Sequence, residues 1–163
     1  MKAALVLFCD HASFLEQAGE INEVFTPVSG QFSQVALWLF SREQPKNIPV
    51  LGFAVSAVKW IFQKDPLLPE TCLHALWQVA GQDRVDLMVF ASDGLGEELA
   101  TRLAYRLKGS SCLQVKRLAL RSGRLRVVKP LYGNHLTGEL ALAAAPFCLS
   151  AARQPCCPAK TTP

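Results

Sequence analysis

The sequence contains no apolar run long enough to cross a lipid bilayer. Its longest such stretch, residues 50–62, contains Lys59 and falls short of the roughly 20 residues that a membrane-spanning helix needs. The apolar run at residues 3–8 imitates a signal peptide, but it is too short, and Phe8 lacks the small side chain that a processing site requires. These absences predict a soluble cytoplasmic protein without membrane insertion.

Charged residues are scarce, at 18% of the chain, and the formal net charge is only +4. A protein that binds nucleic acid usually carries a larger excess of basic residues, concentrated on one face. One basic cluster consists of Arg117, Arg121, Arg124, Arg126 and Lys129. No aromatic side chains lie between these residues, so the solvated face of a strand pair explains them better than a nucleic-acid site. We therefore expect no nucleic-acid partner.

The sequence also lacks the motifs of common catalytic and cofactor sites. It contains no HExxH, Walker loop or GxGxxG, and no nucleophile triad is evident. His74 has no second ligand at the i+4 position, and the adjacent Cys156 and Cys157 lack the spacing of a metal site. Several of the six cysteines lie inside apolar runs, which favours buried free thiols over disulfides. We expect neither catalytic residues nor a metal site.

Hydrophobic residues make up half of the 163-residue chain, which is enough for one full core. The clearest local pattern begins at the unbroken apolar run of residues 87–90, which is typical of a strand covered on both faces of a parallel sheet. A small polar turn follows. Beyond it leucines recur every four residues, at Leu95, Leu99, Leu103 and Leu107. This spacing predicts a helix over residues 94–108, which Gly109 ends.

Similar apolar runs predict the other strands of the sheet. Strands are expected at residues 3–8, 35–40, 50–55, 86–91 and 147–151. Residues 57–62 are interpreted as a short helix or turn that places Trp60 in the core. Strands that alternate with helices are typical of a three-layer α/β domain with a mostly parallel central sheet. We therefore predict that fold class.

Further helices and turns are expected between these strands. A helix over residues 69–81 has Leu73, Leu76, Trp77 and Ala80 on one face, and a short helix and loop occupy residues 13–30. Residues 113–120 and 124–131 alternate polar and apolar side chains around a turn, which predicts a hairpin. The pattern of residues 139–145 fits either a helix or a strand.

Two groups of polar residues follow predicted strands, where open α/β sheets place their sites. Cys9, Asp10 and His11 end the first strand, although a polar turn is sufficient to explain them. The candidate loop for binding a nucleotide phosphate consists of Ser92, Asp93, Gly94 and Gly96, at the start of the helix over residues 94–108. Asp93, Glu97 and Glu98 oppose an anion at this loop, which contains no lysine or arginine.

Two stretches, DLMVFASDGLGEELATRLAYRL and RSGRLRVVKPLYGN, resemble the N-terminal domain of the electron-transfer flavoprotein α subunit. The matching features are the helix motif at residues 96–104, the hairpin at residues 122–125 and the turn at residues 129–134. The segment DPLLPE at residues 65–70 also resembles the start of a family helix. One difference is that the family turn has two glycines before its asparagine, whereas Gly133 alone precedes Asn134 here.

The resemblance implies a domain over residues 1–153 and no FAD-binding domain in this chain. Residues 154–163 contain three prolines and no large apolar side chain, which predicts a flexible tail. Family members pair with a β subunit and carry electrons through FAD from dehydrogenases to a quinone or another acceptor. The chain would then be a scaffold and pairing part, not an enzyme, and would bind no FAD by itself. Because the family domain resembles adenine-nucleotide-binding α/β folds, the alternative is a nucleotide-binding module that uses Ser92, Asp93, Gly94 and Gly96.

Overall fold

The computed structural model describes residues 1–153 and 161. Its largest element is a six-stranded parallel sheet in the order β3-β2-β1-β4-β9-β5. The strands are β1 (Lys2–Phe8), β2 (Gln34–Ser41), β3 (Ala57–Phe62), β4 (Leu87–Phe90), β5 (Ser110–Val115) and β9 (Phe147–Ala151). The predicted parallel sheet is confirmed, although two of its strands, β3 and β5, lie outside the segments expected for it.

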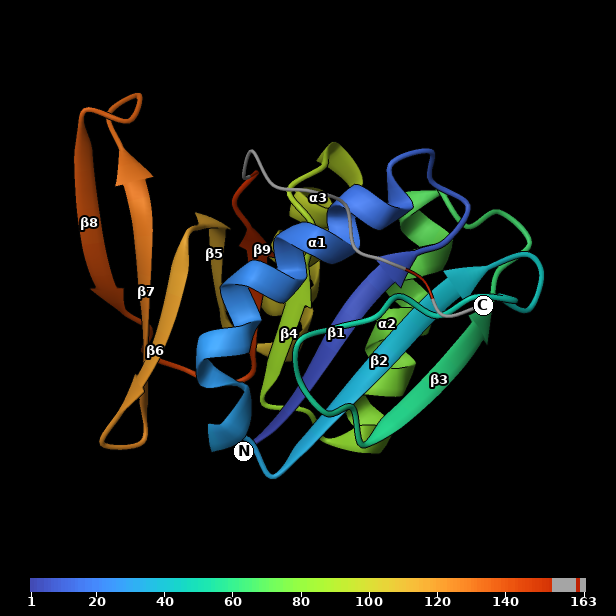
Figure 1. Ribbon diagram of the computed structural model, residues 1–163, viewed down its shortest axis with the longest axis horizontal. Coiled ribbons are helices and arrows are strands. Elements are labelled where there is room, and N and C mark those ends of the chain that lie inside the picture. Colours follow the sequence, from blue (N-terminus) through green and yellow to red (C-terminus); the bar gives the residue numbers. More distant parts are fainter. Residues whose placement is uncertain (154–160, 162–163) are drawn as a thin grey trace.

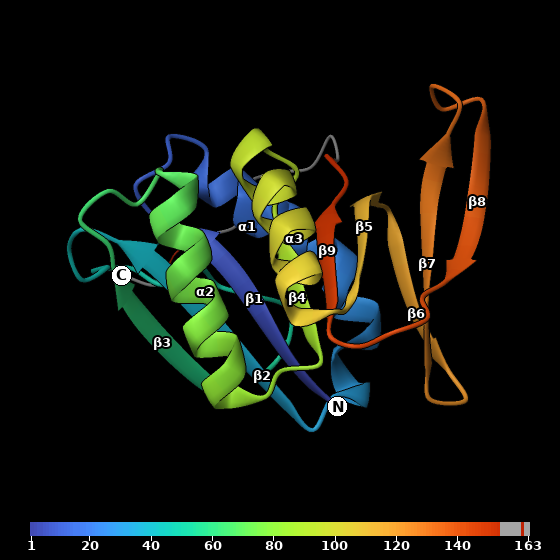
Figure 2. The same cartoon turned by 180° about the vertical axis from the view of Figure 1, so that it is seen from behind.

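Helices cover both faces of this sheet and complete the three layers. Helix α1 (Phe14–Phe25), which continues into the 3-10 helix η1 (Thr26–Gln31), lies on the face seen in Figure 1. Helices α2 (Pro69–Asp83) and α3 (Gly94–Leu107) lie on the opposite face, seen in Figure 2. The predicted α/β fold class is therefore confirmed.

The buried strands alternate their side chains between two apolar clusters, one on each face of the sheet. Leu5 and Leu37 point into the cluster on the α1 side, whereas Val6 and Trp38 point into the cluster beneath α2 and α3. This two-sided burial explains why the sequence shows unbroken apolar runs instead of the alternation of a half-exposed strand.

Helix α3 packs closely on the sheet because Gly96 is small. A Cβ atom at Gly96 would overlap the carbonyl oxygen of Ala91 at the end of β4. At the other end of the helix Lys108 adopts a left-handed conformation with φ 56°, and the Gly109 N–H donates to the Ala104 carbonyl oxygen at 2.9 Å. The helix therefore stops where the sequence predicted, but Lys108 occupies the left-handed position that glycine usually takes.

A smaller antiparallel sheet, which we call the arm, projects from the body in both views (Figures 1 and 2). It consists of β6 (Arg117–Arg121), β7 (Arg124–Leu131) and β8 (Leu136–Ala141). The predicted hairpin is β6 and β7, joined by Ser122 and Gly123 with φ of 52° and 73°. Two positive φ angles match the twist of a two-residue hairpin. In the segment 139–145, which was predicted as either a helix or a strand, the residues up to Ala141 belong to β8.

The strand predicted at residues 50–55 is wrong. That segment is irregular, and its side chains Leu51, Phe53 and Val55 pack against the core without joining a ladder. The third strand is instead β3, in the stretch interpreted as a helix or turn, and it forms the edge of the sheet. Because no strand covers its outer side, Trp60 is 41% exposed and its predicted core position is also wrong.

Three smaller expectations have mixed outcomes. Leu73, Leu76 and Ala80 of α2 are buried as predicted, but Trp77 is 45% exposed because it lies beyond the edge of that face. The stretch 113–120 is divided between β5 of the main sheet and β6 of the arm. Within the described residues, no helix is long and apolar enough to cross a membrane.

Cys9, Cys72, Cys112 and Cys148 are free thiols, and the last three are buried as predicted, whereas Cys9 is only partly buried. Cys156 and Cys157 lie outside the described residues, as does the predicted tail apart from Thr161. Thr161 forms an antiparallel bridge with Pro49.

Candidate functional site

The chain reverses its direction of winding across the sheet between β1 and β4, so the carboxyl ends of these strands flank a crevice. Open α/β sheets bind ligands at such points. Polar side chains from α1, the end of β4 and the end of β9 surround a cavity of about 190 Å³ there. We call this cavity the switch-point site. Its polar lining includes His11, Ser13, Gln17, Glu20, Ser92, Asp93 and Arg153.

Asp93 contacts Gly96, Gln17 and His11 at the switch-point site. One carboxylate oxygen accepts a hydrogen bond of 2.6 Å from the Gly96 N–H and thereby caps α3. The other oxygen accepts a bond of 2.9 Å from Gln17 Nε2 and lies 3.5 Å from His11 Nε2. The protein's own carboxylate therefore occupies the positive end of the helix, where a phosphate would otherwise bind.

Glu20 occupies the other donors of the same loop. Its carboxylate oxygen Oε2 accepts hydrogen bonds from the Ser92 N–H at 3.4 Å and the Ser92 hydroxyl at 3.1 Å. The side chain is only 7% exposed, and this burial raises the pKa of Glu20 despite the opposing effects of Ser92 and Arg153. The buried carboxyl group of Glu20 therefore links α1 to the end of β4.

His11 is held in one orientation by Ser13 and Asp93. The Ser13 N–H donates to His11 Nδ1 at 3.2 Å, and the Ser13 hydroxyl lies 2.9 Å from the same nitrogen. Nδ1 is therefore an acceptor, which leaves the proton on Nε2, toward Asp93. Ser13, His11 and Asp93 are thus connected by short contacts in that order. The nearby N–H groups of Ser92 and Gly96 are already hydrogen-bonded to carboxylates. These N–H groups are therefore not available to stabilise an oxyanion. The arrangement instead holds the loop after β1 to the loop after β4.

The trio predicted at the end of β1 does not converge. Only His11 reaches the switch-point site, because Asp10 Oδ2 accepts a hydrogen bond from the Arg42 N–H at 2.9 Å. Burial, together with the charge of Asp10, raises the pKa of Cys9 to about 12. This thiol is therefore not a nucleophile at neutral pH.

The structure brings Ser92, Asp93, Gly94 and Gly96 together at the start of α3, as predicted. Sequence reasoning missed Glu20, Gln17 and Arg153, which join them from distant parts of the chain. The site does not fit FAD. Its volume is below the roughly 300–1,000 Å³ of ligand pockets, and its two amide donors already have partners.

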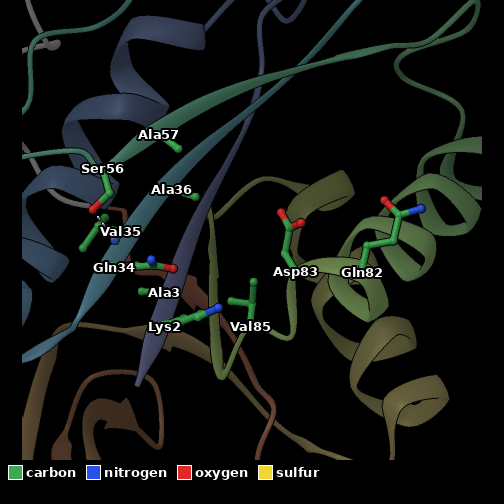
Figure 3. A pocket seen from close by; sticks show the side chains of 10 residues that line it. All are labelled: Lys2, Ala3, Gln34, Val35, Ala36, Ser56, Ala57, Gln82, Asp83 and Val85. Atoms are coloured by element: carbon green, nitrogen blue, oxygen red, sulfur yellow. Dashed lines mark hydrogen bonds between the residues drawn. The ribbon is translucent and has the colours of Figure 1, made fainter.

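A larger hollow of about 340 Å³ lies at the amino edge of the sheet, between the first residues of β1 to β3 and the end of α2 (Figure 3). Two of its polar groups, Asp83 and Ser56, are already engaged. Asp83 forms an ion pair of 2.7 Å with Lys59, and the Ser56 hydroxyl accepts a bond of 3.1 Å from the Val35 N–H. Because α/β sheets bind ligands at the carboxyl edge, this hollow is not the candidate site.

The arm presents a second candidate surface, which we call the leucine face. Leu140 pairs with Val127, and Leu136 pairs with Leu131, so these side chains lie on one face of the arm. Near the body this face is covered, and Val127 is fully buried. Farther out it is not, since Leu136 is 58% exposed and Leu140 is 41% exposed. The arm therefore exposes a strip of two leucines, which Lys129 interrupts on the same face. Exposed apolar side chains of this kind mark protein interfaces.

No protein-family model matches the chain. Over 134 residues the chain is 30% identical to an Escherichia coli (strain K12) protein named "Putative electron transfer flavoprotein subunit YgcQ". The chain resembles an electron transfer flavoprotein subunit. The match covers 82% of this chain and 43% of that protein, so the chain spans less than half of this relative's length. The similarity supports a family like the electron transfer flavoproteins for most of the chain, in agreement with the motifs at residues 86–134.

Proposed function

We propose that residues 1–153 form the N-terminal domain of an electron-transfer flavoprotein α-type subunit. In this proposal the domain pairs with a β-type subunit in an FAD-dependent carrier that takes electrons from dehydrogenases and passes them to a quinone or another acceptor. The domain acts as scaffold and pairing surface, has no catalytic residues, and leaves the FAD to a second domain of the α subunit. The similarity to the Escherichia coli protein supports the family part of this proposal.

The leucine face is the observation that carries the pairing role. Leu136 and Leu140 are more than one third exposed on a sheet that projects from the body (Figure 1). Covering a leucine completely contributes about 1.5–3 kcal/mol relative to leaving it exposed, so covering these half-exposed side chains contributes about 1 kcal/mol each. A partner that packs against the arm would gain this energy without any change in the core.

The switch-point site supports the same role by its chemistry. Asp93 and Glu20 already accept the N–H groups of Gly96 and Ser92. Because these donors are engaged, the site stabilises the junction of α1, β4 and α3. A scaffold requires such a junction, whereas an enzyme would require donors and a nucleophile that face a substrate.

Sedimentation velocity with a co-expressed β-type subunit tests the proposal. We expect a heterodimer at micromolar concentration for the unaltered chain. The double variant Leu136→Lys with Leu140→Lys should weaken pairing at least tenfold, because it places two charges in the apolar strip. The matched control is Val58→Lys with Phe62→Lys, which alters exposed apolar residues on the edge strand β3.

The outcomes separate the family proposal from the choice of surface. A chain that stays monomeric beside the β-type subunit contradicts the pairing function itself. A heterodimer that survives the arm variant but not the β3 variant would keep the function and move the pairing surface to β3.

A further inference from the structure

A cleft of about 340 Å³ separates the arm from the carboxyl edge of the main sheet. The turn between β7 and β8 and the end of β9 lie on the same side of the molecule (Figure 1). The cleft is lined by Gln114, Lys116, Pro130, Asn134 and Arg153, with Ser92 and Ala152 behind them. Its volume lies within the roughly 300–1,000 Å³ range of small-molecule sites. None of the functions considered above uses it.

A bulge in β5 shapes one wall of this cleft. Between Cys112 and Val115 the strand takes three steps while β9 takes two, from Leu149 to Ala151. Gln114 lies within this bulge in a left-handed conformation with φ 56°. Its N–H donates to the Ser150 hydroxyl at 2.8 Å. Such a conformation is uncommon for a residue other than glycine, and bulges often redirect side chains beside binding sites.

Two cations follow this bulge and line the cleft. Val115 pairs with Ala151, and the Ala152 N–H donates to the Val115 carbonyl oxygen at 2.7 Å, so Lys116 and Arg153 follow adjacent strands at one edge. The Lys116 N–H donates to the Val128 carbonyl oxygen at 2.8 Å, which ties this position to the arm. Both side chains line the cleft, so the fold directs two like charges toward it.

These two cations have no ion-pair partner in the part of the chain that the structure describes. Other cations do have one: Lys59 pairs with Asp83, Arg102 with Glu98 and Arg126 with Glu139. The acid that interacts with Arg153 is Glu20, which is buried and hydrogen-bonded to Ser92. Glu20 therefore compensates the charge of Arg153 in part, whereas Lys116 has no acid within ion-pair distance among the described residues.

We propose that the cleft between the arm and the body binds a small-molecule oxyanion, a phosphate or a carboxylate, between Lys116 and Arg153. The guanidinium and the ammonium donate to the oxygens of the anion, and the side-chain amides of Gln114 and Asn134 complete the donors. Among the described residues no carboxylate lines this cleft, so a cation is not favoured there. This cleft shares Ser92 and Arg153 with the switch-point site, but its other lining residues come from β5 and the arm.

Titrations followed by amide NMR test this site, with inorganic phosphate and, separately, succinate as probes at constant ionic strength. We expect saturable binding of at least one probe with a dissociation constant below about 1 mM, and shifts centred on residues 114–116, 134 and 153. Raising sodium chloride from 50 to 500 mM should weaken binding several-fold, since exposed charges are screened. The preferred probe distinguishes a phosphate site from a carboxylate site.

The double variant Lys116→Met with Arg153→Met should weaken binding at least 50-fold. The matched control, Lys64→Met with Arg124→Met, removes two exposed cations elsewhere and should leave binding within twofold. Asn134→Gly keeps the left-handed turn, at φ 71°, but removes the amide and should cost two- to fivefold. No saturation of either probe by 20 mM, or equal losses in the two double variants, would overturn the proposal. Circular dichroism checks that each variant is folded.

Discussion

Gly109 is the position where adding one methyl group is expected to cost the most stability. A Cβ atom at this position would overlap the carbonyl oxygen of Pro146, just before β9. The same oxygen accepts a hydrogen bond of 3.1 Å from the Ser110 N–H at the start of β5. Neither group is a flexible side chain that could move aside. The Gly109→Ala variant must therefore separate the two backbones by more than ~1 Å to restore ordinary contact distances.

The cost has two parts. Overpacking in a rigid region costs about 1–3 kcal/mol. Loss of the hydrogen bond between Ser110 and Pro146 leaves backbone groups unsatisfied, which adds about 1–3 kcal/mol. We expect Gly109→Ala to lower the free energy of unfolding by about 4 kcal/mol, near the middle of the combined range. For a chain of this length that corresponds to a fall in Tm of roughly 8–16 °C.

Urea unfolding and differential scanning calorimetry measure this effect, and Lys108→Gly is the matched control. Lys108 is in the left-handed region at φ 56°, so glycine there relieves about 1–2 kcal/mol of strain. Glycine also adds about 0.5–1 kcal/mol of chain entropy to the unfolded state, so the net change should be small or favourable. If Gly109→Ala unfolds within 1 kcal/mol of the unaltered protein, the close approach of β5 and β9 at this point is wrong.

Three further predictions concern the switch-point site. Asp93→Ala should destabilise the protein by about 1–2 kcal/mol in urea unfolding, and Asp93→Asn should cost less because asparagine still caps a helix; equal costs would show that the cap contributes nothing. Because folding raises the pKa of Glu20, the contribution of this carboxyl group to stability is present below its unfolded pKa and is lost as pH rises through its folded pKa. Glu20→Gln should therefore stabilise the protein more at pH 7 than at pH 4. A larger gain at pH 4 would contradict that sign. Finally, calorimetric titration of the isolated chain with FAD, and separately with AMP, should give dissociation constants weaker than about 10 μM. Tighter binding of AMP that Ser92→Ala with Gly94→Ala abolishes would favour the nucleotide-binding module instead.

Local sequence patterns predicted most of the fold because the central strands are buried on both faces. A strand such as β1 or β4 needs apolar side chains in both directions, so its sequence is an unbroken apolar run that few other structures tolerate. Helix α3 was equally clear, since its four-residue leucine spacing is bounded by Asp93 and Gly109. The β6–β7 hairpin followed from Ser122 and Gly123, which accept positive φ angles.

The same reasoning could not predict which apolar segment forms the edge of the sheet. Residues 50–55 and 57–62 are both short and apolar, and only the pairing of β3 with β2 decides between them. Exposure of Trp60 is a consequence of that pairing, because an edge strand lacks a neighbour on one side. Local periodicity contains no information about what lies beyond the next strand.

The sequence by itself determined the fold class, the central strands, the helices and the loop from Ser92 to Gly96. Only the tertiary structure decided what surrounds that loop, because Glu20 and Arg153 reach it from positions far away in the chain. The arm–body cleft arose in the same way, since Lys116 and Arg153 become neighbours only when β5 pairs with β9. Electrostatic sites depend on distances between side chains, and folding sets those distances across segments that no sequence window contains together.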